Sequence, residues 1–254
     1  MTKIGIIGGS GLDNPDILKN PEDVVCSTLY GKPTAPLRHG IIADQEVFII
    51  GRHGREHTIP PTQVNYRANI AALKEIGCDC IVATTAVGSL RERIGRGHFV
   101  ILDQFIDFTR HRKNTFYEEF EPGTPMHTPM ADPFNELLRS YLINSCVSSG
   151  FTHHEKGTVV SIEGPRFSTR AESHMFRGFG ADVINMTIAT EAALANEAGL
   201  PYAALAMSTD YDCWKEDEAP VTWEEVLKTF MENADKATKI LVDVITEIGT
   251  KGLK

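Results

Sequence analysis

Two carboxylates stand two residues apart, Asp210 and Asp212, a few residues after the apolar run 202–207. On an extended chain such residues point to the same side, so both would share one pocket. Like charges in a partly desolvated pocket raise at least one pKa, which suits an acid that donates a proton to a leaving group. Paired carboxylates also occur in glycosidases and Mg²⁺ sites, although glycosidase carboxylates flank the sugar and normally come from different strands. A pair that merely caps the following turn is the structural alternative.

A basic motif, Gly-Arg-His-Gly-Arg at 51–55, follows the apolar run 46–50. Arg52 offers bidentate, charge-assisted hydrogen bonds to a phosphate, and His53 adds a donor. We favour an anion site over a solvated basic loop, because the flanking glycines would add nothing to such a loop. The expected place is the crevice at the carboxyl ends of the strands of an open α/β sheet.

Three further segments place hydroxyl groups after apolar runs. The Gly-rich turn 8–11 carries Ser10, and its backbone N–H groups suit an oxyanion. It has neither Gly-x-Gly-x-x-Gly nor the lysine of a P-loop, so a dinucleotide site is disfavoured. Thr85 follows the run 80–84, and Thr187 can cap a predicted helix whose N-terminus favours anions. For Thr85, the preference of threonine for strand ends and turns is a serious alternative.

The segment 163–172 combines a Gly-Pro turn with the aromatic Phe167. Phe167 could stack on a planar base, and a core phenylalanine is an equal interpretation by position alone. Ser168 or Thr169 could instead cap the following helix, with Glu172 completing a capping box if Thr169 is the cap.

The composition narrows the class of protein. Of 254 residues 42% are hydrophobic and 23% charged, as in an ordinary globular protein, and the net charge of -9 argues against nucleic-acid or acidic-membrane partners. No apolar run approaches the ~20 residues of a membrane helix, and the start of the chain lacks a signal-peptide pattern. The five cysteines, with Cys-x-Cys at 78–80, lack zinc-ligand spacing. We therefore expect free thiols, a cytoplasmic location and no metal.

Short β-branched runs alternate with helical periodicity along the whole chain, which predicts one α/β domain over 1–254 with a mixed or parallel central sheet flanked by helices. Asp132 and Pro133 are expected to open one of the helices. The irregular segment 109–129 is expected to be functional or part of an interface. The strands are expected at 3–7, 46–50, 80–84, 99–102, 158–162, 182–184 and 202–207, and helices at 63–76, 132–149, 188–198 and 222–248.

At these segments the chain resembles the trimeric purine nucleoside phosphorylases. The matching motifs fall in the family's order and spread along nearly the whole chain. They are Gly-Ile-Ile-Gly-Gly-Ser-Gly-Leu (5–12), Arg-His-Gly-Arg (52–55), Asn-Tyr-Arg-Ala-Asn (65–69), Glu-Gly-Pro-Arg-Phe-Ser-Thr-Arg-Ala-Glu-Ser (163–173), Asp-Val-Ile-Asn-Met-Thr (182–187) and Thr-Asp-Tyr-Asp-Cys-Trp (209–214). The resemblance implies that family's single-domain fold, with a central mixed sheet flanked by helices, and a homotrimer.

The resemblance also implies a role for each matched position. The residues expected to hold phosphate are Ser10, Arg52, His53, Thr85, Ala86 and Thr187. Met186 would contact the ribose hydroxyls, while Phe167 and Ser168 would line the base site. His127 would reach a neighbouring subunit's 5′ pocket, and Leu227 would help form the apolar pocket for a methylthio group.

The implied reaction is phosphorolysis of methylthioadenosine, with inorganic phosphate as co-substrate and no other cofactor. Asp210 and Asp212 would read the purine, and Asp210 would donate a proton to N7. Relatives that act on 6-oxopurines have Asn at the purine-reading position, which argues against that substrate class here. A water-using nucleosidase and a catalytically silent nucleotide-binding protein are the competing hypotheses. Ser10 and Thr190 depart from the family's frequent Thr and Pro, which we expect to leave the chemistry unchanged.

Overall fold

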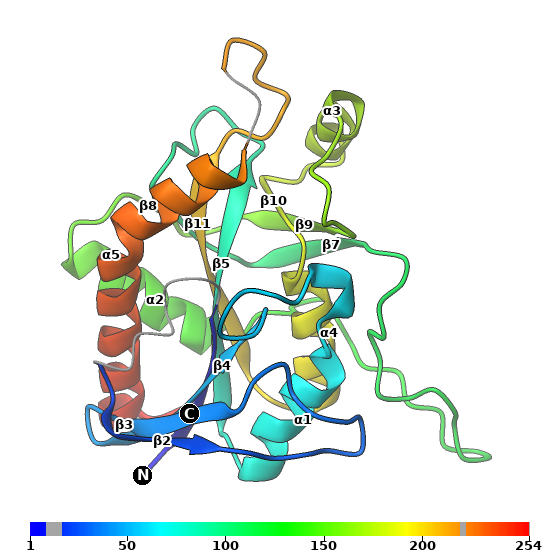
Figure 1. Ribbon diagram of the computed structural model, residues 1–254, viewed down its shortest axis with the longest axis vertical. Coiled ribbons are helices and arrows are strands. Elements are labelled where there is room, and N and C mark those ends of the chain that lie inside the picture. The colour runs from blue at the N-terminus through cyan, green and yellow to red at the C-terminus, as the bar shows by residue number, and fades with distance from the viewer. Residues whose placement is uncertain (9–16, 219–221, 254) are drawn as a thin grey trace.

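The protein is described by a computed structural model covering residues 1–8, 17–218 and 222–253 (Figure 1). In these residues eleven strands form one sheet, with the main order β2-β3-β4-β1-β5-β10-β9-β7, while β11 lies beside β5 and β6, and β8 beside β6. The strands are β1 (Lys3–Gly8), β2 (Lys19–Val24), β3 (Leu37–Ile42), β4 (Gln45–Gly51), β5 (Cys80–Ser89), β6 (Phe99–Ile101), β7 (Gln104–Phe108), β8 (His153–His154), β9 (Thr158–Ile162), β10 (Val183–Asn185) and β11 (Tyr202–Asp210). Because β1 runs parallel to β5 and β10 runs antiparallel to it, the sheet is mixed and the predicted α/β class is confirmed.

The long strand β5 connects the two parts of the sheet and extends beyond the predicted run 80–84. Its first half pairs with β1, it pairs with β11 along most of its length as far as Gly88, and Ser89 pairs with β10. The small residues that follow Thr84 therefore lie inside a paired strand and not in a turn after it. Glycine in a strand interior marks a close approach by another group, and at Gly88 that group is the carboxylate of Asp210.

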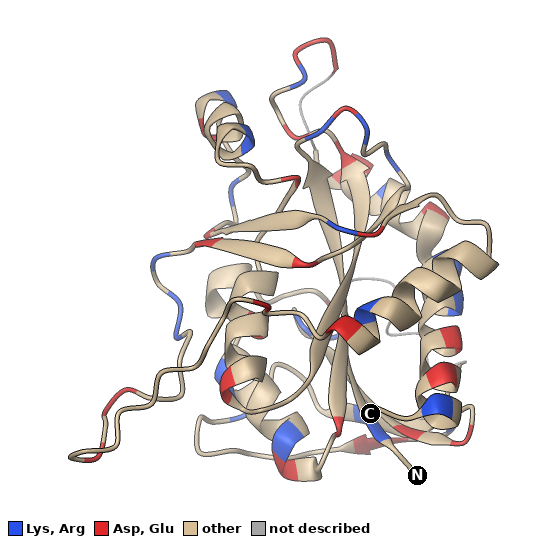
Figure 2. Ribbon diagram, turned by 180° about the vertical axis from the view of Figure 1, so that it is seen from behind, with Lys and Arg blue, Asp and Glu red and all other residues tan. Residues whose placement is uncertain are grey.

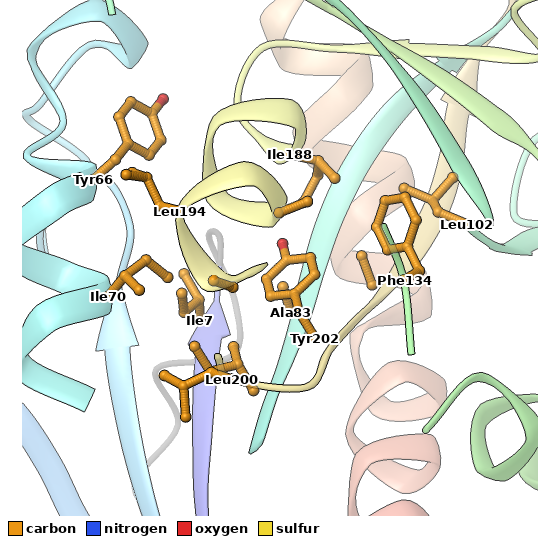
Figure 3. Packing of buried hydrophobic residues seen from close by; sticks show 14 of the residues in the cluster. Ile7, Tyr66, Ile70, Ala83, Leu102, Phe134, Ile188, Leu194, Leu200 and Tyr202 are labelled. Atoms are coloured by element: carbon orange, nitrogen blue, oxygen red, sulfur yellow. The ribbon is translucent and has the colours of Figure 1, made fainter. Parts of the chain in front are cut away.

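Helices cover both faces of the sheet (Figure 1). They are α1 (Tyr66–Ile76), α2 (Glu136–Ser148), α3 (Arg170–Gly178), α4 (Ile188–Glu197) and α5 (Trp223–Lys251). Alternate residues of β1 serve opposite faces: Ile4 and Ile6 pack in the cluster that contains α2 and α5, and Ile7 packs with α1 and α4. Figure 3 shows the second of these clusters, with Ile7 beside Ile70 of α1. The prediction of flanking helices is confirmed.

The helix ends test the capping predictions. Gly77 ends α1 with φ 87°, in the left-handed region that glycine favours. Thr169 and Glu172 form the expected capping box at the start of α3. The prediction that Asp132 opens a helix is wrong, because α2 begins three residues later, where the side chain of Asn135 accepts a hydrogen bond from a helix N–H.

Charged residues of both signs are spread along the chain. Acidic and basic positions are interspersed over the helices and loops, as Figure 2 shows. Within the ranges that the structure describes, no helix is both long enough and apolar enough to span a membrane.

Candidate active site

A pocket of about 390 Å³ opens between the end of β4, the second half of β5, β10, the end of β11 and the first turns of α5. It brings together residues that are far apart in the sequence. The predicted site residues that line it are Arg52, His53, Thr85, Ala86, Phe167, Ser168, Met186, Thr187, Asp210, Asp212 and Leu227. Ser10 lies outside the described residues.

Arg52 lies at the end of β4 and is only 2% exposed. Its Nε and Nη2 atoms face the carboxylate of Glu191 on α4, and Nη1 donates to the backbone oxygen of Thr84 at 3.0 Å. Burial alone would lower the pKa of Arg52, but the charge and hydrogen bonds of Glu191 raise it, so the guanidinium stays charged. The edge of the guanidinium expected to bind phosphate therefore binds Glu191. Arg52 still offers the pocket its positive charge and the second Nη1 hydrogen, which Thr84 does not bind.

His53 follows Arg52 and is held by a two-way hydrogen-bonded contact with Ile59. Its Nδ1 lies 2.8 Å from the Ile59 carbonyl oxygen, and the Ile59 N–H donates to the His53 carbonyl oxygen at 3.0 Å. Burial, together with the charge of Arg52, lowers the pKa of His53 to about 4, so the ring is neutral near pH 7. Because a carbonyl only accepts, Nδ1 carries the proton and Nε2 is an acceptor. The expected donor role of His53 thus differs from its geometry.

Thr85 and Thr187 are joined by Asn185, the last residue of β10. The Asn185 amide donates to the Thr85 hydroxyl at 3.2 Å, and its carbonyl oxygen accepts from Ser161 at 2.7 Å and from the Thr187 N–H at 3.4 Å. Thr187 occupies the N-cap position of α4, as expected, but its side chain makes no cap hydrogen bond. Its hydroxyl therefore lies at the positive end of a helix dipole, next to the Arg52 end of the pocket.

Asp210 is 5% exposed and ends β11. Its two oxygens accept from the Thr209 hydroxyl at 2.8 Å and from the Asp212 N–H at 2.7 Å. Burial raises the pKa of Asp210 to about 6 in spite of these hydrogen bonds, and the charge of Asp212 adds to the rise. A carboxyl group with this pKa carries a proton for part of the time near neutral pH, as a general acid requires.

Asp212 meets Asp210 through a turn and not along an extended chain. Its φ is 49°, in the left-handed region that Asp tolerates better than most residues. The Ser168 hydroxyl lies 2.7 Å from each of the Asp212 carboxylate oxygens. Burial raises the pKa of Asp212. The pair therefore lies close together, as expected, but its geometry comes from the turn after the strand.

Phe167 and Met186 lie on either side of the Gly-Pro turn. Phe167 is 41% exposed at the pocket wall, which does not fit the alternative of a core phenylalanine. Gly164 has a φ of 66°, and a Cβ built there would lie 2.4 Å from the Met186 sulfur. Glycine at 164 thus allows the turn to press against Met186, which lines the pocket.

The other end of the pocket is apolar. It is formed mainly by the first turns of α5, where Leu227 lies, and by the segment after His53. Trp223, the first residue of α5, packs against His57 with ring centroids 5.0 Å apart, and His57 packs against His53 at 4.5 Å. The apolar side chains of this end are Ile59, Trp223, Val226, Leu227 and Phe230.

His127 is not in this pocket. It lies in the long segment between β7 and α2, which projects away from the body of the molecule (Figure 1), and its ring contacts Phe120 at 5.5 Å. The start of this segment is bound next to the Gly164-Pro165 turn, since Glu163 accepts hydrogen bonds from the N–H groups of Arg110 and His111 at 2.6 and 3.0 Å. Within one copy of the chain, His127 therefore does not contribute to this pocket.

Comparisons with known proteins match almost the full chain. Residues 3–246 match the model of the phosphorylase superfamily. The chain belongs to the phosphorylase superfamily.

The matches to relatives in this superfamily also extend over most of each relative's own length. The S-methyl-5′-thioadenosine phosphorylase of Danio rerio is 55% identical over 97% of this chain and 89% of its own, and that of Thermofilum pendens is 51% identical over 97% and 92%. Among solved structures, methylthioadenosine phosphorylase from Schistosoma mansoni in complex with adenine has a TM-score of 0.93 at 41% identity, covering 98% of this chain and 93% of that one. A mutant of the adenosine/methylthioadenosine phosphorylase of the same organism, in complex with methylthioadenosine, has a TM-score of 0.92 at 40% identity, covering 98% and 92%.

Several residues that position the site carry no clear signal in the sequence. Glu191 has no assigned role there, although a lone carboxylate in the apolar run of α4 signals a buried partner cation. Asn185 was noted only as part of a motif, yet it joins the two threonines. Trp223 and Val226 also line the pocket, although their positions in the predicted helix 222–248 give no sign of this.

Proposed function

We propose that this protein cleaves 5′-deoxy-5′-methylthioadenosine with inorganic phosphate, giving adenine and 5-methylthioribose 1-phosphate. The observation that carries the proposal is one pocket with a cationic, hydroxyl-rich end at Arg52 and a buried carboxyl group of raised pKa at Asp210. The names of the relatives, S-methyl-5′-thioadenosine phosphorylases at 50–55% identity, support the choice of substrate.

Phosphate binds at the end formed by Arg52, His53, Thr85, Ala86 and Thr187, with Ser10 as a further donor. The positive charge of Arg52 and the N-terminus of α4 attract the anion. Arg52 is already oriented by Glu191, so the phosphate meets a donor that does not have to reorganise. From there the phosphate stabilises an oxocarbenium-like sugar and then bonds to its anomeric carbon.

The leaving purine gains negative charge as the glycosidic bond breaks. Protonated Asp210 donates its proton to N7, and the raised pKa of this carboxyl group fits that role. Asp212, held by Ser168, accepts from the exocyclic 6-amino group. Phe167 stacks on the purine, and Met186 contacts the ribose hydroxyls.

The apolar end of the pocket binds the methylthio group, and Leu227 is one of its contacts. Burial of a group this small contributes only about 1–2 kcal/mol, so we propose a preference for methylthioadenosine over adenosine and not strict selection.

We further propose that the protein is a cytoplasmic homotrimer of single-domain subunits in which His127 reaches a neighbour's 5′ pocket. The projecting segment that carries His127 supports this assembly, and the five unpaired cysteines support a reducing compartment. The partners are the nucleoside and phosphate, and the proposed reaction needs no metal or organic cofactor.

The test is release of adenine from methylthioadenosine with and without phosphate, with inosine as a parallel substrate. Phosphate-dependent release with little cleavage of inosine supports the proposal. Equal release without phosphate would make the enzyme a nucleosidase, and a preference for inosine would refute the role given to Asp210 and Asp212.

A further inference from the structure

His53 presents a hydrogen-bond acceptor to a site that is otherwise built from donors and positive charge. The Ile59 carbonyl, 2.8 Å from Nδ1, fixes the proton on that nitrogen, because a carbonyl oxygen has no proton to give. The return hydrogen bond from the Ile59 N–H to the His53 carbonyl, at 3.0 Å, holds the two residues in this arrangement. In the neutral ring, the opposite nitrogen, Nε2, therefore carries a lone pair.

The surroundings of His53 keep the ring neutral. The charged or titratable groups that act on it are Arg52, His57 and Arg112, and all three oppose a second proton. Burial acts in the same direction and is the largest cause of the lowered pKa. The ring also packs against His57, with centroids 4.5 Å apart, so it cannot turn freely.

Nε2 is the ring nitrogen that remains for a ligand, because Nδ1 is bound to the Ile59 carbonyl. His53 lines the pocket next to Arg52, and no group in the described part of the chain hydrogen-bonds Nε2. A ligand at the cationic end thus meets one acceptor among the donors. Such an acceptor is satisfied only by a ligand atom that bears a proton.

We propose that His53 Nε2 accepts the proton of monohydrogen phosphate and so selects a protonated oxyanion over one that carries no proton. Near neutral pH, phosphate and arsenate each retain a P–OH or As–OH group, whereas sulfate and selenate have none. A sulfate oxygen facing Nε2 would place two acceptors together, and an unsatisfied pair of this kind weakens binding roughly ten- to a hundredfold. This selectivity rests on the proposed function, because it assumes that phosphate binds at this end.

The test compares two pairs of tetrahedral oxyanions with similar size within each pair, phosphate with sulfate and arsenate with selenate. Affinities for the full-length enzyme are measured by calorimetry near pH 7.5 at constant ionic strength. We expect each protonated anion to bind at least about tenfold more tightly than its partner. Equal affinities within both pairs would overturn the proposal, and this comparison needs no variant.

A variant separates the acceptor from the general charge of the site. In His53→Gln the side-chain amide can turn its NH₂ group toward the anion, so the phosphate-to-sulfate ratio should fall toward one. His174→Gln, on the exposed side of α3, is the matched control and should keep the wild-type ratio. An unchanged ratio in a folded His53→Gln protein would overturn the proposal.

Failure of this inference is distinguishable from failure of the proposed function. If adenine release depends on phosphate but sulfate binds as tightly, only the role of His53 is wrong. If adenine release does not depend on phosphate, the proposed function itself is wrong.

Discussion

The guanidinium of Arg52 and the carboxylate of Glu191 form an ion pair in which both residues are almost completely buried, with exposed fractions of 2% and 1%. The hydroxyl of Tyr202 donates to the same carboxylate at 2.9 Å, so the pair is part of a network that links β4, α4 and β11. The network fixes the cation before a ligand arrives. It also explains why Arg52 does not present its bidentate edge to the pocket.

Removing one partner of this ion pair should lower the free energy of unfolding substantially. Glu191→Gln leaves Arg52 charged and uncompensated in the interior, which we expect to destabilise the protein by about 3–5 kcal/mol. Urea unfolding at pH 7.5 measures the change, and exposed Glu232→Gln on α5 is the control, with an effect within about 0.5 kcal/mol.

The double variant Arg52→Met with Glu191→Leu tests the same pair from the other side. Apolar side chains of similar volume should restore part of the stability, because both charges are removed together while the buried Tyr202 hydroxyl loses its acceptor. Phosphate-dependent activity should be lost, since the site has lost its cation. A double variant as unstable as Glu191→Gln would contradict this account.

The absence of a side chain at Gly88 leaves room for the carboxylate of Asp210. A Cβ at this position would lie 2.9 Å from Asp210 Oδ1 and 3.0 Å from Ile184 Cγ2. We expect Gly88→Ala to displace the carboxylate and lower kcat roughly a hundredfold, because a shift near 1 Å suffices for such a loss. Steady-state kinetics with methylthioadenosine measures it. Gly178→Ala, where nothing lies within 4 Å of the new Cβ, is the matched control and should keep the wild-type kcat.

Much of this arrangement could be predicted from the sequence, because the strand pattern indicates which segments end near one another. Most of the predicted site residues, Arg52 and Asp212 among them, do line one pocket, and His127 does not. What remained unpredictable depends on pairing across the sheet. Whether Thr85 lies in a turn or inside β5 is decided by its partners in β11.

The hydrogen-bonding state of the site was equally hidden in the sequence. The residue type alone suggests that His53 is a donor to phosphate. Its tautomer is fixed by the Ile59 carbonyl, and that contact depends on the fold of the loop. Likewise, the sequence predicts a bidentate contact of Arg52 with phosphate, but the carboxylate of Glu191, 139 residues away in the sequence, binds that edge of the guanidinium. Residue types indicated the chemistry, and tertiary contacts decided which atoms remain available for it.

The buried carboxyl group of Asp210 should make stability depend on pH. Its pKa in the folded state is about 6, above the ordinary value of 3.8, so its contribution to stability is present at low pH and is lost as the pH rises through about 6. We expect Asp210→Asn to stabilise the protein by about 1–3 kcal/mol near pH 8, and the gain to be largely absent near pH 4.

The geometry allows the substitution without a lost hydrogen bond. The new amide NH₂ can donate to the Thr209 hydroxyl, whose own proton can then turn to the Val87 carbonyl 3.2 Å away, and the amide oxygen can still accept from the Asp212 N–H. Urea unfolding of both proteins across this pH range measures the effect. A gain that stays the same at both ends of the range would show that the charge of Asp210 is not its source.

Leu227 should contribute to binding of the 5′ methylthio group and not to binding of the rest of the nucleoside. It is one of the apolar side chains that line the pocket. Leu227→Ala removes apolar contact with the methylthio group worth about 1 kcal/mol, so the KM for methylthioadenosine should rise about five- to tenfold. The KM for adenosine, which lacks that group, should change less than twofold, and this second substrate serves as the control within the same variant. Equal losses for both substrates would mean that Leu227 supports the fold of the pocket and does not read the 5′ substituent.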